Sequence, residues 1–306
     1  MNGRVKYLFL LVLPCALAHC QSSEDNQPAE VITTQVLEKE NSVAIDTTGY
    51  YYPWKSGYEH QKAFVNQVAE PSGYQRLELP ENSFGDWLRH LPLLDKNIVY
   101  LYNGEEKWNQ SAQYRVVDID VGDKDLQQCA DAVMRLRAEY LYATNQFDQI
   151  HFNYTNGVSI GFDQWKSGFY PSLKGNKVVW VSRNGNNASY ASFKKYMTNI
   201  FMYAGTASLE KELQNKNLKD ILPGDVLIKG GFPGHAVIVV DVAVHPETGD
   251  RMFVLAQSYM PAQNIHILKN PDREDLSPWY SVADCNRFVT SPEWTFESSQ
   301  LKSFEP

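Results

Sequence analysis

The sequence predicts an α+β fold in which helices pack on an antiparallel sheet. Apolar residues recur at alternating intervals of three and four between residues 125 and 143, a period typical of an amphipathic helix. Short runs rich in β-branched residues between residues 225 and 257 are bounded by turn signals and read as strands. Aromatic residues first become frequent at residues 50–54, and no repeat or second long linker follows. We therefore expect a single α+β domain over residues 46–306.

Four segments are expected to be helical. Residues 60–68 form a short candidate, and residues 83–91 form another, with Ser83 as its N-cap. The strongest pattern runs from Asp125 to about residue 143, with Asp125 as the expected N-cap. A fourth helix is predicted over residues 190–205, where the apolar residues share one face.

Five segments are expected to be strands: residues 99–102, 114–121, 225–228, 236–242 and 252–257. A turn rich in glycine and proline, residues 230–234, separates the third strand from the fourth and supplies the backbone angles that tight turns need. His235 follows this turn directly. The pattern thus places one histidine at the mouth of a sheet, where an imidazole can face a cleft and act as a general base or simply cap the strand.

Residues 1–19 are predicted to be a signal peptide, with a basic start and an apolar run too short to span a membrane. One reading cleaves the chain before His19. The other takes Leu17 to Cys20 as a bacterial lipobox in which Cys20 carries the lipid, and the acidic residues that follow resemble a signal for the outer surface. Residues 20–45 then form a flexible tether. We expect an exported protein, an outer-membrane lipoprotein held to the membrane through its lipid anchor only.

Charge and motifs exclude several classes of function. The net charge of −8 and the lack of basic clusters argue against nucleic acid as a partner. There is no phosphate-binding glycine loop and no Gly-x-Ser-x-Gly elbow. The spacing of His235, Asp241, His245 and His266 does not match a metalloprotease motif. We therefore expect neither a metal nor another cofactor.

The cysteines leave two interpretations open. Cys129 and Cys285 are the two cysteines outside the leader, and an exported pair can form a disulfide. Alternatively, Cys129 is a working thiol, because a helix start offers unpaired N–H groups and a positive dipole end that favour the thiolate. Cys129 also lies on the apolar stripe of its helix, so a buried structural cysteine fits the spacing as well.

Several short motifs, in this order along the chain, resemble the CHAP amidohydrolase/peptidase group, a papain-like class related to NlpC-type cell-wall enzymes. They are Gln-Cys129 at a helix start, Pro-Gly-Asp-Val at residues 223–226, Gly-His235 before an apolar strand, and a strand ending in Gln257. The resemblance implies a papain-like core over about residues 114–270. In it, Cys129 is the nucleophile, His235 the base, and a side chain on the next strand orients the imidazole.

The chain departs from this group in two respects. The group usually has an acidic residue where Ala256 stands and an amide where Ser258 stands, which leaves Gln257 to orient His235. The long interval between the cysteine and the histidine also requires an insertion, for which the aromatic segment at residues 150–187 is the candidate. If this segment lines a groove, Tyr154 and Trp165 are the candidates for substrate binding, although aromatic side chains more often fill a core.

Residues 127–142 and 255–263 are also similar to an uncharacterised bacterial domain-of-unknown-function family of lipoproteins, a resemblance that implies no activity. The papain-like resemblance and the predicted export together imply a cysteine amidase or endopeptidase acting on peptidoglycan-type amide bonds. The alternative is a non-catalytic surface lipoprotein that binds glycan or peptide on the same scaffold.

Overall fold

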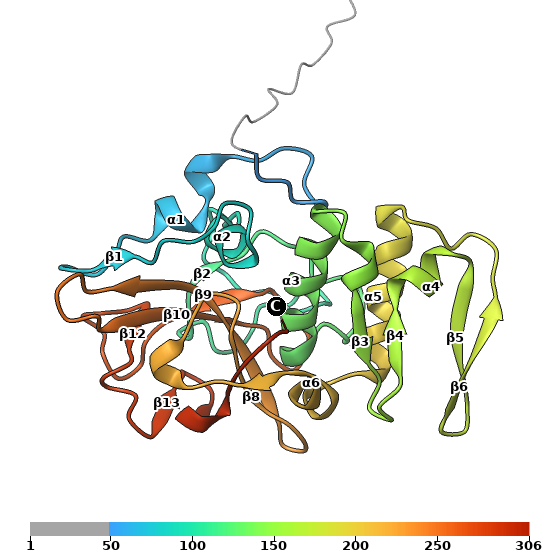
Figure 1. Ribbon diagram of the computed structural model, residues 1–306. Helices are drawn as coiled ribbons and strands as arrows, with labels where there is room; N and C mark the ends of the chain where they lie inside the picture. The colour runs from blue at the N-terminus through green and yellow to red at the C-terminus, as the bar shows by residue number, and fades with distance from the viewer. Residues whose placement is uncertain (1–48, 306) are drawn as a thin grey trace, which may run out of the picture. The chain divides into compact units, whose positions relative to one another are not determined.

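The α+β architecture expected from the sequence is present in the computed structural model, which describes residues 49–305 (Figure 1). These residues lie within one compact unit. The predicted signal peptide, the lipidation site Cys20 and the tether over residues 20–45 lie outside the described residues. No helix among the described residues combines the length and apolar character needed to cross a membrane.

A nine-stranded sheet forms the centre of the described part of the chain, and all its pairings are antiparallel. Its main path runs in the order β2-β11-β10-β9-β8-β15-β7, while β1 pairs with β9 and β12 pairs with β10. The strands are β1 Gln75–Arg76, β2 Gln113–Val116, β7 Gln214–Asn215, β8 Val226–Lys229, β9 His235–Val244, β10 Arg251–Gln257, β11 His266–Leu268, β12 Trp279–Ser281 and β15 Leu301–Ser303.

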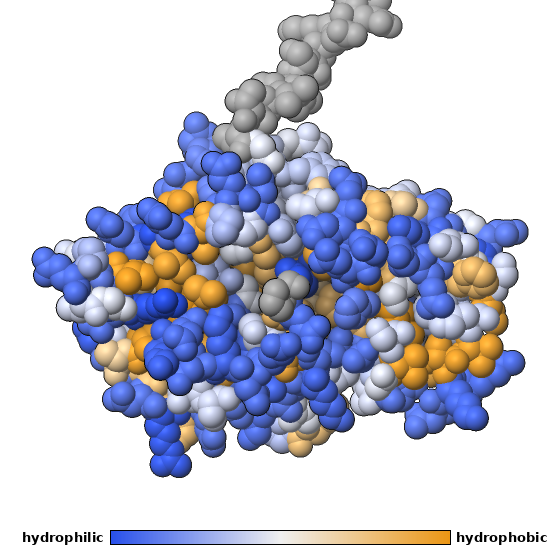
Figure 2. All heavy atoms as spheres, in the orientation of Figure 1, coloured by the Kyte–Doolittle hydropathy of each residue, from blue (hydrophilic) through white to orange (hydrophobic). Residues whose placement is uncertain are grey.

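Three hairpins lie outside this sheet. They are formed by β3 His151–Asn153 with β4 Ser159–Gly161, β5 Phe169–Lys174 with β6 Lys177–Ser182, and β13 Phe288–Thr290 with β14 Thr295–Glu297. The β5–β6 hairpin exposes several apolar side chains, which form the orange patch at the right of Figure 2; they include Phe169, Leu173, Val179 and Val181. Most of the remaining face in that view is hydrophilic.

Six α-helices occur within residues 49–305: α1 Phe64–Gln67, α2 Phe84–Arg89, α3 Cys129–Ala143, α4 Phe162–Lys166, α5 Tyr190–Tyr203 and α6 Thr206–Glu212. Short 3-10 turns add η1 His60–Lys62, η2 Phe147–Gln149, η3 Leu218–Asp220 and η4 Ser298–Gln300. The predicted helices at α2, α3 and α5 are therefore present. Ser83 caps α2 as expected, since its hydroxyl accepts from the backbone N–H of Asp86 at 3.3 Å.

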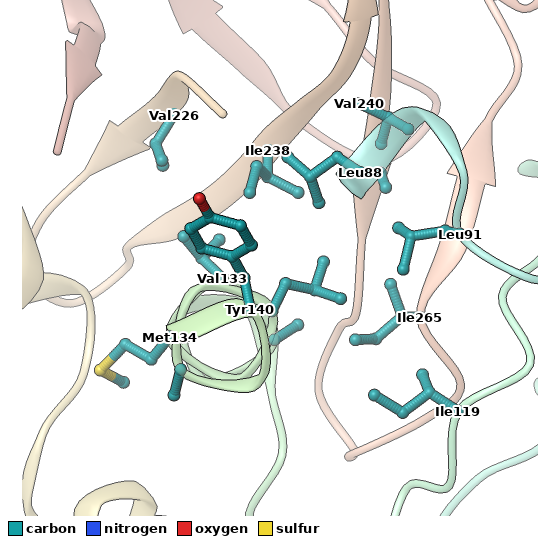
Figure 3. Packing of buried hydrophobic residues seen from close by; sticks show 14 of the residues in the cluster. Leu88, Leu91, Ile119, Val133, Met134, Tyr140, Val226, Ile238, Val240 and Ile265 are labelled. Carbon is teal, nitrogen blue, oxygen red and sulfur yellow. The ribbon is translucent and has the colours of Figure 1, made fainter. Parts of the chain in front are cut away.

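The core lies between α3 and the sheet. Figure 3 shows Val133 and Tyr140 of α3 on the side of the helix that faces Ile238 of β9 and Leu88 of α2. Val133, Leu88 and Ile238 are each at most 1 % exposed. Full burial of such a side chain contributes about 1.5–3 kcal/mol. The three-and-four periodicity of α3 thus anchors the helix on β9 and holds its first residue at one end of that strand.

Some predicted elements are wrong. Residues 60–68 do not form one helix, because Ala63 is extended and pairs with Pro92, which separates η1 from α1. Residues 99–102 form isolated bridges, Tyr100 with Glu106 and Leu101 with Gln263, in place of a strand. The strand expected over residues 114–121 ends at Val116.

Candidate active site

Cys129 is the first residue of α3, and the predicted cap of this helix is corrected by one turn. Gln128 is the N-cap, and its backbone N–H donates to the Asp131 carboxylate at 3.0 Å. Asp125 does not cap the helix, because its carboxylate instead accepts from the backbone N–H of Ala262 at 2.7 Å. The first i to i−4 bond of the helix runs from Ala132 to Gln128, so the N–H groups before Ala132 are not used within the helix.

The Cys129 thiol is half-buried and lies beside the start of β9. Backbone N–H groups of Ala130, Ala236 and Cys129 itself act to lower its pKa, which places the sulfur next to the residue that follows His235. Burial is the larger effect, and together with the Asp131 carboxyl it raises the pKa of the thiol to about 11. The N–H groups at the helix start therefore favour the thiolate as expected, but burial and Asp131 outweigh them, and the thiol is protonated at neutral pH.

The two cysteines do not form the disulfide that was one of the alternatives, because both are free thiols. Cys285 is buried in a second apolar cluster that includes Tyr280 and Val289. Burial raises the pKa of its thiol to about 12. Cys129 is therefore the more accessible of the two thiols.

His235 is the first residue of β9 and pairs with Lys229 of β8 across the glycine-rich turn. The turn needs its glycines: Gly231 has φ +110°, and a Cβ on Gly234 would lie 2.5 Å from the carbonyl oxygen of Gly231. The His235 side chain is 2 % exposed, and burial lowers the pKa of its imidazole to about 4. The ring is therefore neutral at pH 7 and can accept a proton.

The hydrogen bond expected between Gln257 and His235 is present, with 2.9 Å between Oε1 of Gln257 and Nε2 of His235. Nε2 of Gln257 donates to Glu293 at 2.7 Å and lies 3.4 Å from Nε2 of His266. His266 uses Nδ1 to donate to the carbonyl of Asn264, so its Nε2 is an acceptor. Gln257 therefore turns its NH₂ group toward Glu293 and His266 and its oxygen toward His235. Nε2 of His235 must then carry the proton, and Nδ1 the free lone pair.

An ion pair between Lys107 and Glu293 fixes the orientation of the Gln257 amide. The carboxylate of Glu293, in the β13–β14 connection, accepts from Lys107 Nζ at 2.6 Å and from Asn109 Nδ2 at 3.1 Å. The Lys107 side chain is 4 % exposed and that of Glu293 10 %. Sequence reasoning missed both residues, because neither belongs to a motif and they are 186 positions apart. They hold the Gln257 amide in one orientation.

A β-bulge places Gln257 on the face of the sheet that carries His235. In the pairing of β10 with β9, Val254 lies opposite Asp241, but the next residue, Leu255, lies opposite Val239, so one residue of β9 is skipped. Ala256 then lies opposite Ile238. This second register puts Gln257 on the same face as His235, because side chains alternate along a strand. Without the bulge, Ser258 would take that face. Bulges of this kind often re-aim a side chain beside a functional site.

Aromatic rings enclose the imidazole. The ring centroids of Tyr259, Trp294 and Phe296 lie 4.8, 5.3 and 5.8 Å from that of His235. The charge of a Cys129 thiolate acts to raise the pKa of Tyr259, which places this tyrosine near both the thiol and the imidazole. The rings exclude water from the bond between His235 and Gln257, which strengthens it.

Three exposed apolar side chains belong to residues that lie close along the chain to residues of the site, and sequence reasoning missed them. Trp108, 92 % exposed, lies between the two residues that hold Glu293; Phe232 is fully exposed on the turn before His235; and Met260 follows Tyr259. Exposed apolar side chains around polar groups are typical of binding sites.

Tyr154 and Trp165 lie elsewhere, in the core. They are 1 % and 2 % exposed; the hydroxyl of Tyr154 donates to Asn199, and Trp165 donates to Ser192 at 3.0 Å. A substrate could reach neither without opening the core. The placement favours the core interpretation of the aromatic segment.

The four residues considered for a zinc site are not gathered, and no group of three or more ligating side chains occurs in the part of the chain that the structure describes. Asp241 is instead fully buried between Arg76 and Arg89, each donating Nε to its carboxylate at 2.7 Å.

Comparison with known proteins identifies one relationship. Neither the search of curated proteins nor the search of solved structures found a match. The family model described as domain of unknown function 4846 matches residues 64–303, a range that contains Cys129, His235, Gln257 and Glu293. The chain belongs to the family of domain of unknown function 4846.

Proposed function

We propose that this protein is a cysteine amidase or endopeptidase with a papain-like core, in which Cys129 is the nucleophile and His235 the general base. The observation that carries the proposal is the hydrogen bond between His235 and Gln257, which leaves the lone pair of the imidazole on Nδ1. The Cys129 thiol lies beside the backbone N–H of Ala236, the residue after His235, and is the proposed second partner of an activated Cys–His pair.

The protonation states of the resting pair define the first step. The Cys129 thiol and the His235 imidazole are both neutral at pH 7, since their pKa values are about 11 and 4. The proton must therefore move during the attack, with Nδ1 accepting it as the sulfur bonds to the carbonyl carbon of the amide. The imidazolium then protonates the leaving nitrogen, the C–N bond breaks, and a thioester remains on Cys129.

Hydrolysis of the thioester reverses these roles. His235 takes a proton from water, the hydroxide adds to the carbonyl carbon, and the C–S bond breaks as the imidazolium returns a proton to the sulfur.

The oxyanion that forms in each half of the reaction needs hydrogen-bond donors. The backbone N–H groups of Cys129 and Ala130 at the start of α3, which face the sulfur, are the proposed donors, and one such donor contributes about 3–4 kcal/mol in other enzymes.

Peptidoglycan stem peptides are the proposed substrate class, and the proposed location is the cell envelope, with the chain held to the outer membrane through a lipid on Cys20. The lipobox-like sequence before the tether supports this location. Trp108, Phe232 and Met260 are the proposed contacts for the substrate, in place of Tyr154 and Trp165, because they are exposed and lie close along the chain to residues of the site.

The alternative is a surface lipoprotein that binds glycan or peptide on this scaffold without cutting it. One observation favours it: burial and the Asp131 carboxyl hold the Cys129 thiol in its protonated, less nucleophilic form. Binding at the exposed aromatic residues would not need the thiol.

Digestion of purified sacculi separates the two functions. The amines released are labelled and identified by mass spectrometry for the wild-type protein, Cys129→Ala and His235→Ala, with Cys285→Ala as the matched control. The proposal expects one class of new amine from the wild type and from Cys285→Ala, and none from the other two. Sacculus binding with no released amine would support the alternative.

A further inference from the structure

A cavity of about 490 Å³ lies apart from the Cys129–His235 site and shares no lining residue with it. Its walls come from α3, η2, β3, β4, α6 and the end of the described chain. The volume is in the range of sites that hold small molecules. Leu141, Phe152 and Phe304 give it an apolar wall, and charged side chains complete the lining.

Arg137 of α3 supplies a cation with no ionic partner among the described residues. Its guanidinium lies over the rings of Phe84, Tyr140 and Phe304, at 5.1, 5.8 and 5.3 Å from their centroids. Arg135, two residues earlier, is instead bound to Glu139 at 2.6 Å and to further acceptors. Stacking uses the faces of the Arg137 guanidinium and leaves its N–H edges for a planar oxyanion.

Glu212 at the end of α6 supplies an anion to the same cavity. One carboxylate oxygen accepts from the backbone N–H of Asn153 at 2.8 Å, and no described cation lies within ion-pair distance. Burial raises the pKa of this carboxyl to about 7, so an ammonium group beside it would restore the charged form. Arg137 and Glu212 line the same cavity and form no ion pair with each other, so both groups are available to a molecule bound there.

We propose that this cavity binds a small zwitterion, an amino acid or short peptide, whose carboxylate pairs with Arg137 and whose ammonium group pairs with Glu212. The apolar wall takes the side chain. Planar carboxylates match the guanidinium fork through two parallel hydrogen bonds. Asp148 and Glu305 add negative charge to the lining, which favours a ligand that carries an ammonium group as well. The site is independent of the proposed catalysis.

Calorimetric titration of the full chain carrying Cys129→Ala tests this, because the variant lacks the proposed nucleophile and any heat reports binding alone. The probes are D-alanine, D-alanyl-D-alanine, its N-acetyl derivative and acetate. We expect one of the two zwitterions to bind, and acetylation or loss of the amine to weaken binding on the order of tenfold or more. The comparison of amino acid with dipeptide assigns the length of the ligand.

Three variants locate the binding. Arg137→Gln and Glu212→Gln should each weaken the tighter zwitterion at least about tenfold, whereas Arg183→Gln, which removes a guanidinium stacked on Tyr170 in the β5–β6 hairpin, should not. Arg137→Lys keeps the positive charge but lacks the planar pair of N–H donors of the guanidinium. It replaces Arg137→Gln in this test if that variant does not fold. Absence of zwitterion binding, equal affinity for acetate, or unchanged affinity in both cavity variants would overturn the proposal.

Discussion

Replacing Gln257 by alanine is the sharpest perturbation of the candidate site, because one side chain joins three groups. The change removes the acceptor for His235, one donor to Glu293 and the contact with His266. Ser258→Ala is its matched control: Ser258 is equally buried and is the next residue, but its hydroxyl contacts the backbone carbonyls of Gln127 and Gln263 at 3.0 and 2.9 Å.

The expected magnitudes follow from these contacts. Gln257→Ala loses a hydrogen bond to a charged group, about 1.5–3 kcal/mol, and leaves two buried ring nitrogens short of a partner, so we expect about 3–4 kcal/mol of lost stability. Ser258→Ala should cost about 1–2 kcal/mol. In catalysis, Gln257→Ala frees the imidazole to rotate and to adopt the wrong tautomer. A loss of about 2–3 kcal/mol of transition-state stabilisation lowers kcat/KM roughly 30- to 160-fold.

Urea unfolding measures the loss of stability. The rate of amine release from the cleaved substrate measures the loss of kcat/KM. Ser258→Ala should keep its kcat/KM within about threefold of the wild type, since it faces away from His235. Equal activities for the two variants would refute the reasoning, because the bulge between Val254 and Leu255 would then not decide which side chain orients the base.

Three further predictions concern the same region. Iodoacetamide should alkylate Cys129 in the native protein at least about tenfold faster than the buried Cys285, and peptide mapping that finds equal rates would contradict the burial of the second thiol. Burial lowers the pKa values of His235 and His266 in the folded protein to about 4 and 3. Below pH 6.5 the unfolded chain therefore binds more protons than the folded protein does. The free energy of unfolding should decrease as the pH falls from 6.5 toward 4, by on the order of 3 kcal/mol for His235 alone. Urea midpoints that do not fall between pH 7 and 4.5 would exclude this. Asp241→Asn leaves two buried arginines without a carboxylate and should cost about 3–5 kcal/mol in thermal or urea unfolding, and a loss under 1 kcal/mol would show that the arginines find other acceptors.

Local patterns were enough to predict the elements that carry the site. Burial of one face of α3 requires apolar residues at intervals of three and four, and this spacing is visible in the sequence. Burial of β9 and β10 likewise requires the runs of β-branched residues that mark both strands. The resemblance to the CHAP group implied that a side chain on this strand orients His235, and Gln257 was the residue available there. The hydrogen bond between them is present.

Long-range contacts explain what the sequence could not reveal. Glu293 contacts Gln257 from 36 positions away, and Lys107 contacts Glu293 from 186 positions away, and neither has a local pattern that marks a contact. The cap of α3 was misplaced because Asp125 binds Ala262, a residue that the fold brings to it. The net pKa of the Cys129 thiol could not be predicted for the same reason: the helix start that lowers it was visible in the sequence, but the burial that outweighs this effect comes from tertiary packing.

The central claim is that the Cys129 sulfur attacks an amide carbonyl, and acid quenching followed by peptide mapping with mass spectrometry tests it most directly. Protein mixed with a stem-peptide substrate is quenched within the first turnover, digested, and mapped. The account predicts an acyl adduct on the peptide that contains Cys129 in the wild type and none in His235→Ala. Substrate cleavage without this adduct, or full cleavage by Cys129→Ala, would contradict it.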